Sequence, residues 1–458
     1  MHKFRKIVSV TAAWLFLSAL LALAPSVAIA SLKADTPLPT PVPPEPYPNS
    51  DVYPAVVYLA SEADLQTLYD LNIDMDGLRP VSGVWRGSGG HEPALATIYI
   101  NPIQSSALVQ AGITPVPIPN EGYRSFLDHG PGTDSPPGWP TFAQYVARMQ
   151  ALQAAHPDIV SLVSIGQSVQ DRELWCMEVS DYPGLDEFEP EFKYTANHHG
   201  DETTGIEMTV RFAEYLADNY GIDQQITDLV DKMEIWLCPI YNPDGYVNGS
   251  RYNYNGVDLN RNYPDRFEGY PPNPQPETLA FMNFETNHRF VMGANYHGGA
   301  QVLNYPWDAV ADPDNPIYAP DDRLFYDFGI GYTSRNPDLW EHGLYEHGIT
   351  RGFEWYMIYG GMQDWDYYYN GEHHVTIEIS WDKNPEFNLM DTYWNNNREA
   401  MLWWMQRAWT GLAGMVVDVR NNAPLDASVT LVGMDLPNTI LTDPDYGDYH
   451  RVISAGLY

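Results

Sequence analysis

Basic residues are scarce in this sequence of 458 residues, which has 24 lysines and arginines against 60 aspartates and glutamates. The formal net charge is -36. Nucleic-acid binding depends on lysine and arginine side chains that replace the counterions of the phosphates, so the chain is not expected to bind nucleic acid. The charge suits a solvated acidic surface, and composition alone does not show whether it also attracts cationic substrates.

Cysteine is almost absent, since only Cys176 and Cys238 occur, each inside an apolar run. Two cysteines cannot build the disulfide framework of a small secreted domain. A hydrophobic content of 44% is ample for a large core instead. The two cysteines either pair with each other or lie buried as free thiols, and the sequence leaves both possibilities open.

Long apolar runs are also lacking, except at the N-terminus. There "MHKFRK" precedes an apolar stretch over residues 7–23, and "SVAIA" closes it. This order predicts a secretory signal peptide over residues 1–30, so the protein is expected to be extracellular or periplasmic. A membrane anchor is the alternative, but polar residues interrupt the stretch and it falls short of the ~20 residues that span a bilayer. No cysteine follows for a lipid anchor, and no later stretch could span a membrane.

Composition divides the rest of the chain into four parts. Residues 31–51 are a proline-rich linker, expected to be extended and semi-rigid. Residues 52–125 alternate strand-like and helix-like runs and predict a small α+β unit. Strands and helices then alternate over residues 137–410, which predicts an α/β domain with a mixed central sheet flanked by helices. Residues 411–458 show period-two alternation with turn dipeptides and predict a small β-sandwich.

Individual runs predict most elements of the long domain. "TFAQYVARMQALQAAHP", "GIEMTVRFAEYLADNYG" and "TYWNNNREAMLWWMQRAW" predict helices, whereas "FKYTANHH", "EIWLCPIYNPDG", "VMGANYHGG" and "HVTIEIS" predict strands. Ligands often bind at the carboxyl ends of strands in such sheets. Several histidines and carboxylates stand at those ends here.

The stretch "YTANHHGDETTG" contains two histidine–carboxylate pairs with a spacing of three, His198 with Asp201 and His199 with Glu202. A catalytic zinc site uses three protein ligands, often two histidines and a carboxylate, and leaves a fourth position for water. His297, at the end of another strand, could complete either pair. A pair of this kind is weak evidence alone, because a hydrogen-bonded polar turn has the same residues.

Arginine is concentrated at one place in this arginine-poor chain. The segment "SRYNYNGVDLNRNYPD" contains Arg251, Asn260 and Arg261 within eleven residues. Arginine recognises carboxylates through paired, planar hydrogen bonds. The segment therefore indicates a site for an anionic group.

Six motifs in this order, "HHGDE", "NPDG", "GVDLNRNYP", "HGGAQVLNYPWD", "YMIYGGMQDW" and "TIEIS", resemble those of the zinc metallocarboxypeptidases. The resemblance is to the branch that includes carboxypeptidases N, E and D, and it extends over about residues 139–410. The last 48 residues resemble that branch's transthyretin-like domain, which we expect to be incomplete because related chains continue for more strands. Residues 52–125 weakly resemble the pro-segments of other metallocarboxypeptidases, which leaves inhibition of the enzyme open.

The resemblance implies a zinc-dependent exopeptidase that removes the C-terminal residue of peptides and proteins by attack of a zinc-bound water. By this resemblance, His199, Glu202 and His297 match the ligands of one zinc ion. Glu378 matches the general base, and Arg251 matches the residue that stabilises the oxyanion. Asn260, Arg261 and Tyr356 match the residues that bind the terminal carboxylate. A buried arginine facing a carboxylate explains cleavage of the last residue only, because an internal peptide would leave the arginine unpaired.

Two further matches imply a preference for C-terminal Arg or Lys. Asp308 lies eleven residues after His297, and Gln363 lies seven after Tyr356, as in the basic-specific branch. The alternative for Asp308 is a turn cap. Two other functions stay open, namely a zinc amidase or deacylase on the same scaffold and a secreted binding module without activity. The natural substrate and the oligomeric state cannot be read from the sequence.

Overall fold

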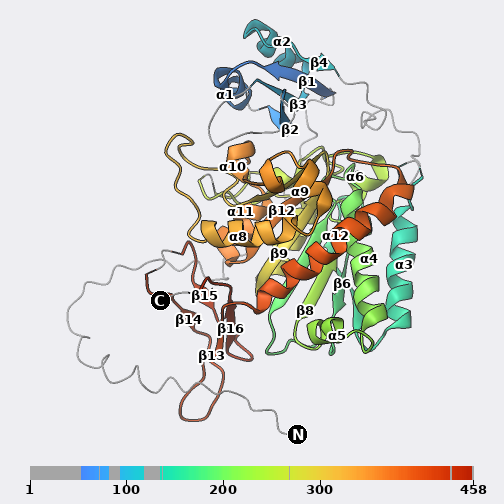
Figure 1. Ribbon diagram of the computed structural model, residues 1–458, viewed down its shortest axis with the longest axis vertical. Helices are drawn as coiled ribbons and strands as arrows, with labels where there is room; N and C mark the ends of the chain where they lie inside the picture. The colour runs from blue at the N-terminus through green and yellow to red at the C-terminus, as the bar shows by residue number, and fades with distance from the viewer. Residues whose placement is uncertain are drawn as a thin grey trace, which may run out of the picture. The chain divides into compact units, whose positions relative to one another are not determined.

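A mixed eight-stranded sheet forms the centre of the molecule in the computed structural model (Figure 1), in the order β11-β10-β12-β9-β7-β8-β6-β5. Its strands are β5 (Val160–Gln167), β6 (Glu173–Val179), β7 (Glu191–Ala196), β8 (Glu234–Cys238), β9 (Phe290–His297), β10 (Ala300–Tyr305), β11 (Ile349–Arg351) and β12 (His373–Ser380). The four strands β12, β9, β7 and β8 run parallel, and β10, β6 and β5 introduce antiparallel pairs. The structure describes residues 53–71, 73–81, 93–117, 135, 136, 138–267, 269–433 and 436–455.

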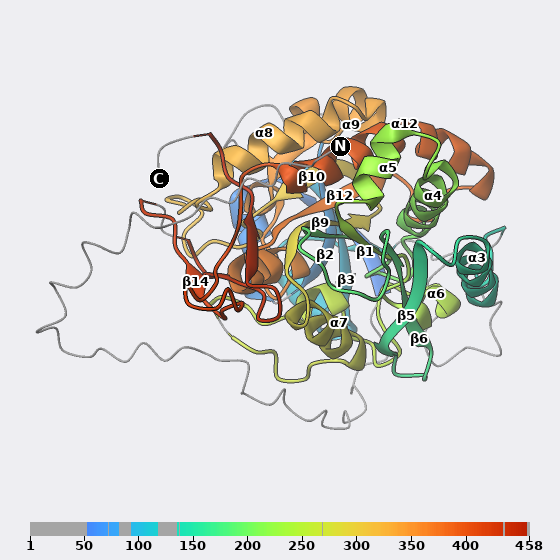
Figure 2. The same ribbon diagram turned by 90° about the horizontal axis from the view of Figure 1, so that it is seen from below.

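Helices cover both faces of this sheet, and Figure 2 shows α4, α5, α8, α9 and α12 along one side with α7 on the other. The first face is covered by α3 (Phe142–Ala155), α4 (Thr204–Asn219), α5 (Gln224–Val230), α8 (Asp322–Thr333), α9 (Pro337–His342) and α12 (Met390–Met405). On the second face, α7 (Pro276–Thr286) and α11 (Met362–Trp365) pack over an apolar cluster that includes Trp236 and Phe281. The predicted α/β class with a mixed central sheet is confirmed. No helix of the described part of the chain is long and apolar enough to cross a membrane.

Short elements connect these layers. They are α6 (Pro243–Asn248), η1 (Leu259–Arg261), η2 (Glu346–Gly348), α10 (Gly352–Trp355), η3 (Asp366–Asn370), η4 (Phe387–Leu389) and η5 (Gln406–Trp409). One of them corrects the sequence prediction, because the strand expected over "EIWLCPIYNPDG" ends at Cys238 and α6 begins at Pro243. The side chain of Asn242 caps α6 by accepting a hydrogen bond from the Gly245 N–H at 2.8 Å, and proline suits a first helical position.

The N-terminal unit is a four-stranded sheet with two helices, in the strand order β2-β3-β1-β4. Its elements are β1 (Tyr53–Leu59), α1 (Glu62–Asp70), β2 (Asp74–Pro80), β3 (Ala94–Ile100), α2 (Pro102–Gln110) and β4 (Val116–Pro117). Its apolar core continues into residues of the long domain, among them Val302, Leu344 and Trp355. The α+β composition agrees with the prediction, and the strand β2 was not predicted.

The C-terminal residues form short strands that pair two by two. They are β13 (Leu412–Met415) with β16 (Asp448–Arg451), and β14 (Ser428–Val429) with β15 (Ile440–Leu441). The likeness of this segment to a transthyretin-like domain stays a prediction. The expected signal peptide and proline-rich linker lie outside the described residues.

A disulfide joins Cys176 of β6 to Cys238 of β8. These two strands are antiparallel neighbours, and Met177 lies opposite Leu237 in their register. The structure therefore decides between the two alternatives left open by the sequence. The bond closes a loop of 62 residues in sequence separation, which restricts the unfolded chain.

Candidate active site

The turn after β7 brings the first two site residues to the edge of the sheet. Asn197 adopts a left-handed backbone conformation with φ 66°, and its side-chain Nδ2 donates to the carbonyl oxygens of His199, Gly200 and Glu202 at 3.0–3.2 Å. Asparagine tolerates this conformation better than most residues. Gly200 is equally constrained, because a Cβ there would lie 2.0 Å from the Gly245 carbonyl carbon. The side chain of Asn197 and the absence of a Cβ at Gly200 thus determine the conformation of the turn.

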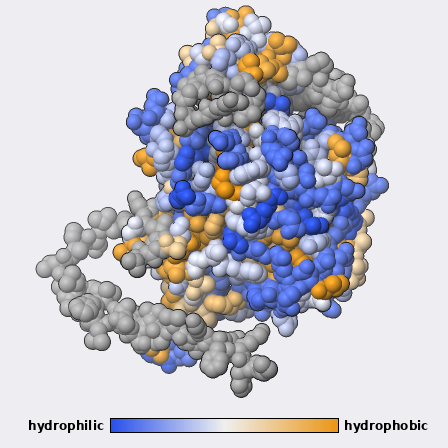
Figure 3. Space-filling model, in the orientation of Figure 1, coloured by the Kyte–Doolittle hydropathy of each residue, from blue (hydrophilic) through white to orange (hydrophobic). Residues whose placement is uncertain are grey.

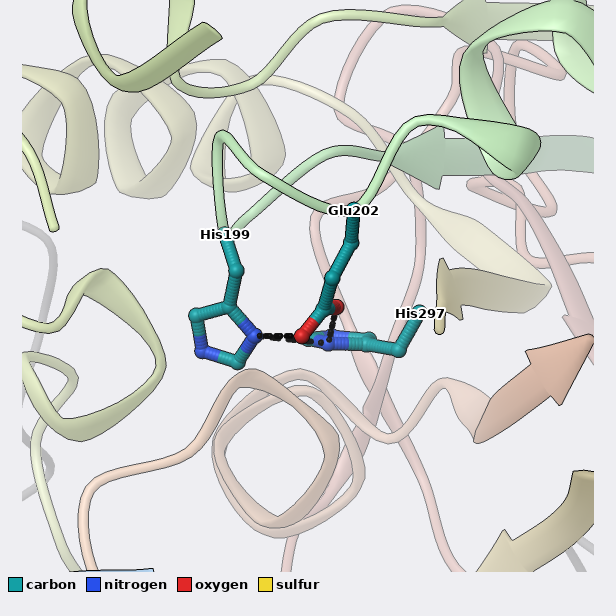
Figure 4. A group of neighbouring side chains, drawn as sticks. All are labelled: His199, Glu202 and His297. Atoms are coloured by element: carbon teal, nitrogen blue, oxygen red, sulfur yellow. Dashed lines mark hydrogen bonds and ion pairs between the residues drawn. The ribbon is translucent and has the colours of Figure 1, made fainter. Parts of the chain in front are cut away.

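His199, Glu202 and His297 converge on one point, as Figure 4 shows, with His297 coming from the end of β9. The Nδ1 atoms of the two histidines lie 3.1 Å apart, and each lies 2.9 Å from an oxygen of Glu202. All three residues are at most 3% exposed. Two imidazole nitrogens and a carboxylate this close together fit a zinc ion. Three protein ligands leave the fourth coordination position of zinc for water.

The other pair of the opening motif is not part of this group. His198 is fully buried and packs against Tyr241 in a tilted arrangement, with ring centroids 3.9 Å apart. Burial holds the pKa of His198 well below its usual value, so the ring is neutral. Asp201 lies 3.3 Å from Lys383 Nζ. The structure therefore brings together the pair His199 and Glu202, and keeps His198 and Asp201 as neighbours.

Glu378 of β12 lies directly beside His297, because these two residues pair in the register of the parallel strands β12 and β9. Residues paired in this way point to the same face of a sheet. The carboxylate is 7% exposed, and its Oε2 has no hydrogen-bond partner among the described residues. Burial, with repulsion from Glu202 and Asp76, raises the pKa of Glu378 well above the usual carboxyl range. A carboxyl with a raised pKa beside a metal centre is suited to general acid–base chemistry.

Arg251 is 1% exposed and reaches the same centre. Its Nη2 donates to Asp258 Oδ2 at 2.8 Å, and its Nη1 lies 3.7 Å from Glu202 Oε1. Asp258 also holds the far nitrogen of His199, with 3.1 Å between Oδ1 and Nε2. This carboxylate orients both a metal ligand and the arginine, a role that sequence reasoning missed although Asp258 lies inside the "GVDLNRNYP" motif.

The remaining predicted residues lie close to one another near this centre. Asn260 Oδ1 accepts from the Met362 N–H at 3.1 Å. Gly361 lies between Asn260 and Asp308, because its added Cβ would come within 3.3 Å of the former and 3.5 Å of the latter. Tyr356 is 5% exposed, and the positive charge of Arg261 acts on it. The structure brings all of these side chains into one region.

Asp308 and Gln363, the two residues matched to substrate preference, are in contact. Gln363 Nε2 donates to Asp308 Oδ1 at 2.7 Å. Asp308 is 2% exposed and forms no ion pair with any residue that the structure describes. Burial and repulsion from Asp364 raise its pKa well above the usual carboxyl range.

Three further residues contact the centre without having been predicted. Lys383 Nζ lies 3.3 Å from Glu202 Oε1 and 2.5 Å from Asp76 Oδ2. Asp76, on β2, also binds Arg251 Nη1, and Asp74 lies 3.5 Å from both Arg251 and Arg261. For Asp74 and Asp76, the only sequence signal was that two acidic residues stand close together in "NIDMDG". This segment has a low propensity to form a strand.

An α/β domain with a His–Glu–His centre at the carboxyl edge of its sheet defines a class, the metal-dependent hydrolases. Comparison with known families narrows it. The family model for zinc carboxypeptidases matches residues 145–400, and the chain belongs to this family. Zinc is therefore the expected metal of the triad, as predicted.

The similar proteins fit the predicted branch. Carboxypeptidase D of Anas platyrhynchos is 39% identical over 325 residues, which cover 66% of this chain and 23% of that protein. Carboxypeptidase M of Mus musculus is 34% identical over 336 residues, covering 68% of this chain and 75% of that one. The chain thus spans about a quarter of the carboxypeptidase D length.

Solved structures support the fold. Carboxypeptidase A from Helicoverpa armigera superimposes with a TM-score of 0.58 at 16% identity, covering 78% of this chain and 98% of that one. Thrombin activatable fibrinolysis inhibitor gives a TM-score of 0.54, also at 16% identity, covering 78% of this chain and 98% of that one. At this identity the likeness concerns the fold alone.

Proposed function

We propose that the protein is a zinc-dependent exopeptidase that removes C-terminal Arg or Lys from peptides and proteins. The observation that supports this most is the arrangement of Glu378 and Arg251 around the His–Glu–His triad, together with the buried carboxylate of Asp308. Zinc, when bound, lowers the pKa of a water molecule and polarises a carbonyl group. His199, Glu202 and His297 would hold it.

The chain's own residues supply the rest of the proposed chemistry. Glu378 takes a proton from the attacking water and passes one to the leaving amine. Arg251 donates hydrogen bonds to the oxygen on which negative charge develops, worth about 3–4 kcal/mol for a well-aimed donor. Asn260, Arg261 and Tyr356 bind the terminal carboxylate and so position the last peptide bond. An internal peptide offers no such carboxylate.

The proposed preference for basic ends rests on Asp308. This buried carboxylate lacks an ion-pair partner among the described residues, and a lysine or arginine side chain would supply one. Gln363 fixes the carboxylate from one side at 2.7 Å. A hydrophobic end would leave Asp308 without a counter-charge, which disfavours its binding.

The test of this preference compares kcat/KM for matched peptides that end in Arg, Lys, Phe and Leu. We expect Arg and Lys ends to be cleaved at least about tenfold better, a gap of ~1.4 kcal/mol. Asp308→Asn keeps the shape and should remove this gap, while the exposed Asp312→Asn in the same loop should keep it. A wild-type preference for Phe or Leu would refute the role of Asp308 and leave the zinc centre standing.

The two alternative functions are tested in the same assay series. An amidase or deacylase would hydrolyse N-acyl amino acids faster than the peptides, and a binding module would bind zinc but cleave neither. Asn260, Arg261 and Tyr356 favour the exopeptidase, because each is suited to binding a peptide carboxylate.

We also propose that the N-terminal unit blocks this site until it is released. Asp76 binds Arg251 and Lys383, and Asp74 lies 3.5 Å from Arg261. Arg261 Nη2 additionally donates to the Met75 carbonyl oxygen at 3.2 Å. A peptide substrate needs the same two arginines, so strand β2 and the substrate exclude each other.

Secretion remains part of the proposal. The Cys176–Cys238 disulfide supports it, because such bonds persist mainly in oxidising compartments.

A further inference from the structure

We propose that the loop between β6 and β7 binds a calcium ion together with the first residue of β8, at the end of strand β7 away from the zinc triad. The ligands would be Asp186 in the loop, Glu191 at the start of β7 and Glu234 at the start of β8. Glu178 of β6 lies on the same face of the sheet near the group. None of these residues takes part in the proposed peptidase chemistry.

The geometry brings three carboxylates to one point. Asp186, Glu191 and Glu234 each offer an oxygen, and these oxygens all lie within 4.8 Å of one another. Glu191 and Glu234 are register partners on the parallel strands β7 and β8, so the sheet itself holds them side by side. Asp186 is exposed and forms the open side of the group.

A fourth carboxylate lies on the same face of the sheet and has an oxygen without a hydrogen-bond partner among the described residues. Glu178 lies opposite Trp236 in the β6–β8 register, and Trp236 points to the same face as Glu234, two residues away on β8. Glu178 is 2% exposed, and its Oε2 forms no hydrogen bond with any described residue. Its other oxygen accepts from the Gly184 N–H at 2.7 Å. A buried, unpartnered carboxylate oxygen is costly unless a ligand satisfies it.

The group also lacks a cation of its own. No lysine or arginine of the described residues forms an ion pair with any of the four carboxylates, and the nearest basic partner is His288, 3.1 Å from Glu191 Oε2. Burial and repulsion from Glu191 raise the pKa of Glu234 to about 9, so its charged form is disfavoured unless a cation joins the group. The carboxylates of Asp443 and Asp448 add to the repulsion at Asp186.

In a second buried cluster, the negative charge of the carboxylates is compensated by a lysine. Asp366, Glu372 and His374 meet the same geometric condition. There, however, Lys193 Nζ lies 3.0 Å from Asp366 and 2.7 Å from Glu372. The chain supplies the cation itself in that cluster, and in the β6–β7 loop it supplies none.

Calcium fits the donors better than other common ions. All three ligands are carboxylates, and hard oxygen donors select calcium, magnesium or manganese over zinc and copper. Calcium accepts six to eight oxygens in flexible geometry, including bidentate carboxylates, whereas magnesium demands a near-ideal octahedron and retains water. A group that combines strand residues with a loop residue and opens to solvent suits the more tolerant ion.

The experiment uses the full zinc-loaded protein in buffer freed of calcium with a chelating resin. Titration with calcium chloride should give one binding event by calorimetry, and 1 mM calcium should raise the melting temperature by at least about 2 °C, because a ligand of the folded state stabilises it. Magnesium chloride at the same concentration should raise it less.

Two variants and a control assign the site. Asp186→Asn, at an exposed position, and Glu234→Gln should each weaken calcium binding at least about tenfold, whereas Glu341→Gln on the exposed face of α9 should bind as the wild type does. Asp186→Asn decides alone if Glu234→Gln does not fold. Absence of a calcium-dependent shift in the wild type, or an unchanged affinity in Asp186→Asn, would overturn the proposal.

Discussion

At the scale of single residues, the site depends on which of two adjacent histidines faces the metal. His199 lies with Glu202 and His297, with its Nδ1 atom 3.1 Å from that of His297. His198 packs against Tyr241 instead, and neither of its ring nitrogens has a hydrogen-bond partner among the described residues. One position in sequence thus separates a ligand from a packed, neutral ring.

The first prediction at this scale concerns metal content. His199→Ala should lose both the zinc and the activity, because two ligands cannot hold the ion tightly. His198→Ala should retain one zinc per chain. Elemental analysis of the two purified variants measures this, and the opposite pattern would show that the choice of pair is wrong.

A second prediction concerns Glu378. Glu378→Gln preserves shape but removes the base, so turnover should fall about 10²–10⁴-fold while zinc content stays at one per chain. The comparison needs kcat, zinc content and a circular dichroism spectrum of both proteins. Near-normal turnover would exclude the assigned role, and loss of fold would point to a structural role.

The sequence motifs predicted the candidate zinc ligands, but they did not predict the residues that contact these ligands. His199 and Glu202 are three residues apart in one turn, but His198 and Asp201 share this spacing, so the family resemblance was needed to choose the pair. Asp258 and Lys383 reach the centre only through tertiary contacts, at 3.1 Å from His199 Nε2 and 3.3 Å from Glu202 Oε1. No local pattern encodes contacts between positions 59 to 181 residues apart.

At the scale of elements, the strand β2 is the clearest departure from the prediction. Its sequence "DMDGLRP" contains aspartate, glycine and proline, which are depleted in strands. It is nevertheless a strand because it pairs with β3 along Asp74–Pro80. Its aspartates also gain partners in Arg251 and Lys383. Strand pairing in the folded protein overrides the low strand propensity of this segment. By contrast, the periodic apolar pattern of α4 was enough to predict it as a helix.

The prediction for this element is that breaking its contact with the site raises activity. Asp76→Asn in the intact chain should increase kcat/KM, because it weakens the hold on Arg251 and Lys383. Proteolytic removal of the N-terminal unit should increase it further. The matched control is Asp70→Asn, an exposed position at the end of α1, which should leave kcat/KM unchanged.

Equal activity before and after removal of the unit would contradict the proposed block. The unit would then act as a folding aid or an unrelated module. Refolding of the long domain with and without the unit distinguishes these two outcomes.

At the scale of the whole molecule, charge is the dominant property. The chain's formal net charge is -36, and the face in Figure 3 is dominated by hydrophilic residues. A charge of one sign and this size creates a field that raises the local concentration of opposite charges and that salt screens.

The corresponding prediction concerns ionic strength. For peptides rich in lysine and arginine, kcat/KM should fall severalfold between 20 and 500 mM sodium chloride, because screening weakens the attraction. Peptides with one C-terminal arginine and no other charge should show a smaller effect. Equal salt dependence for both peptide sets would mean that the acidic surface does not guide substrates.

The apolar contact between the N-terminal unit and the long domain would have a further consequence if the unit is released as proposed. Trp355, Ile358 and Leu344 are buried in a cluster shared with β1 and β3 of that unit. Release of the unit would expose these side chains to water together, beside Tyr356 of the same cluster. The released long domain is therefore expected to self-associate at high concentration and to favour peptides with apolar residues upstream of the cleaved end.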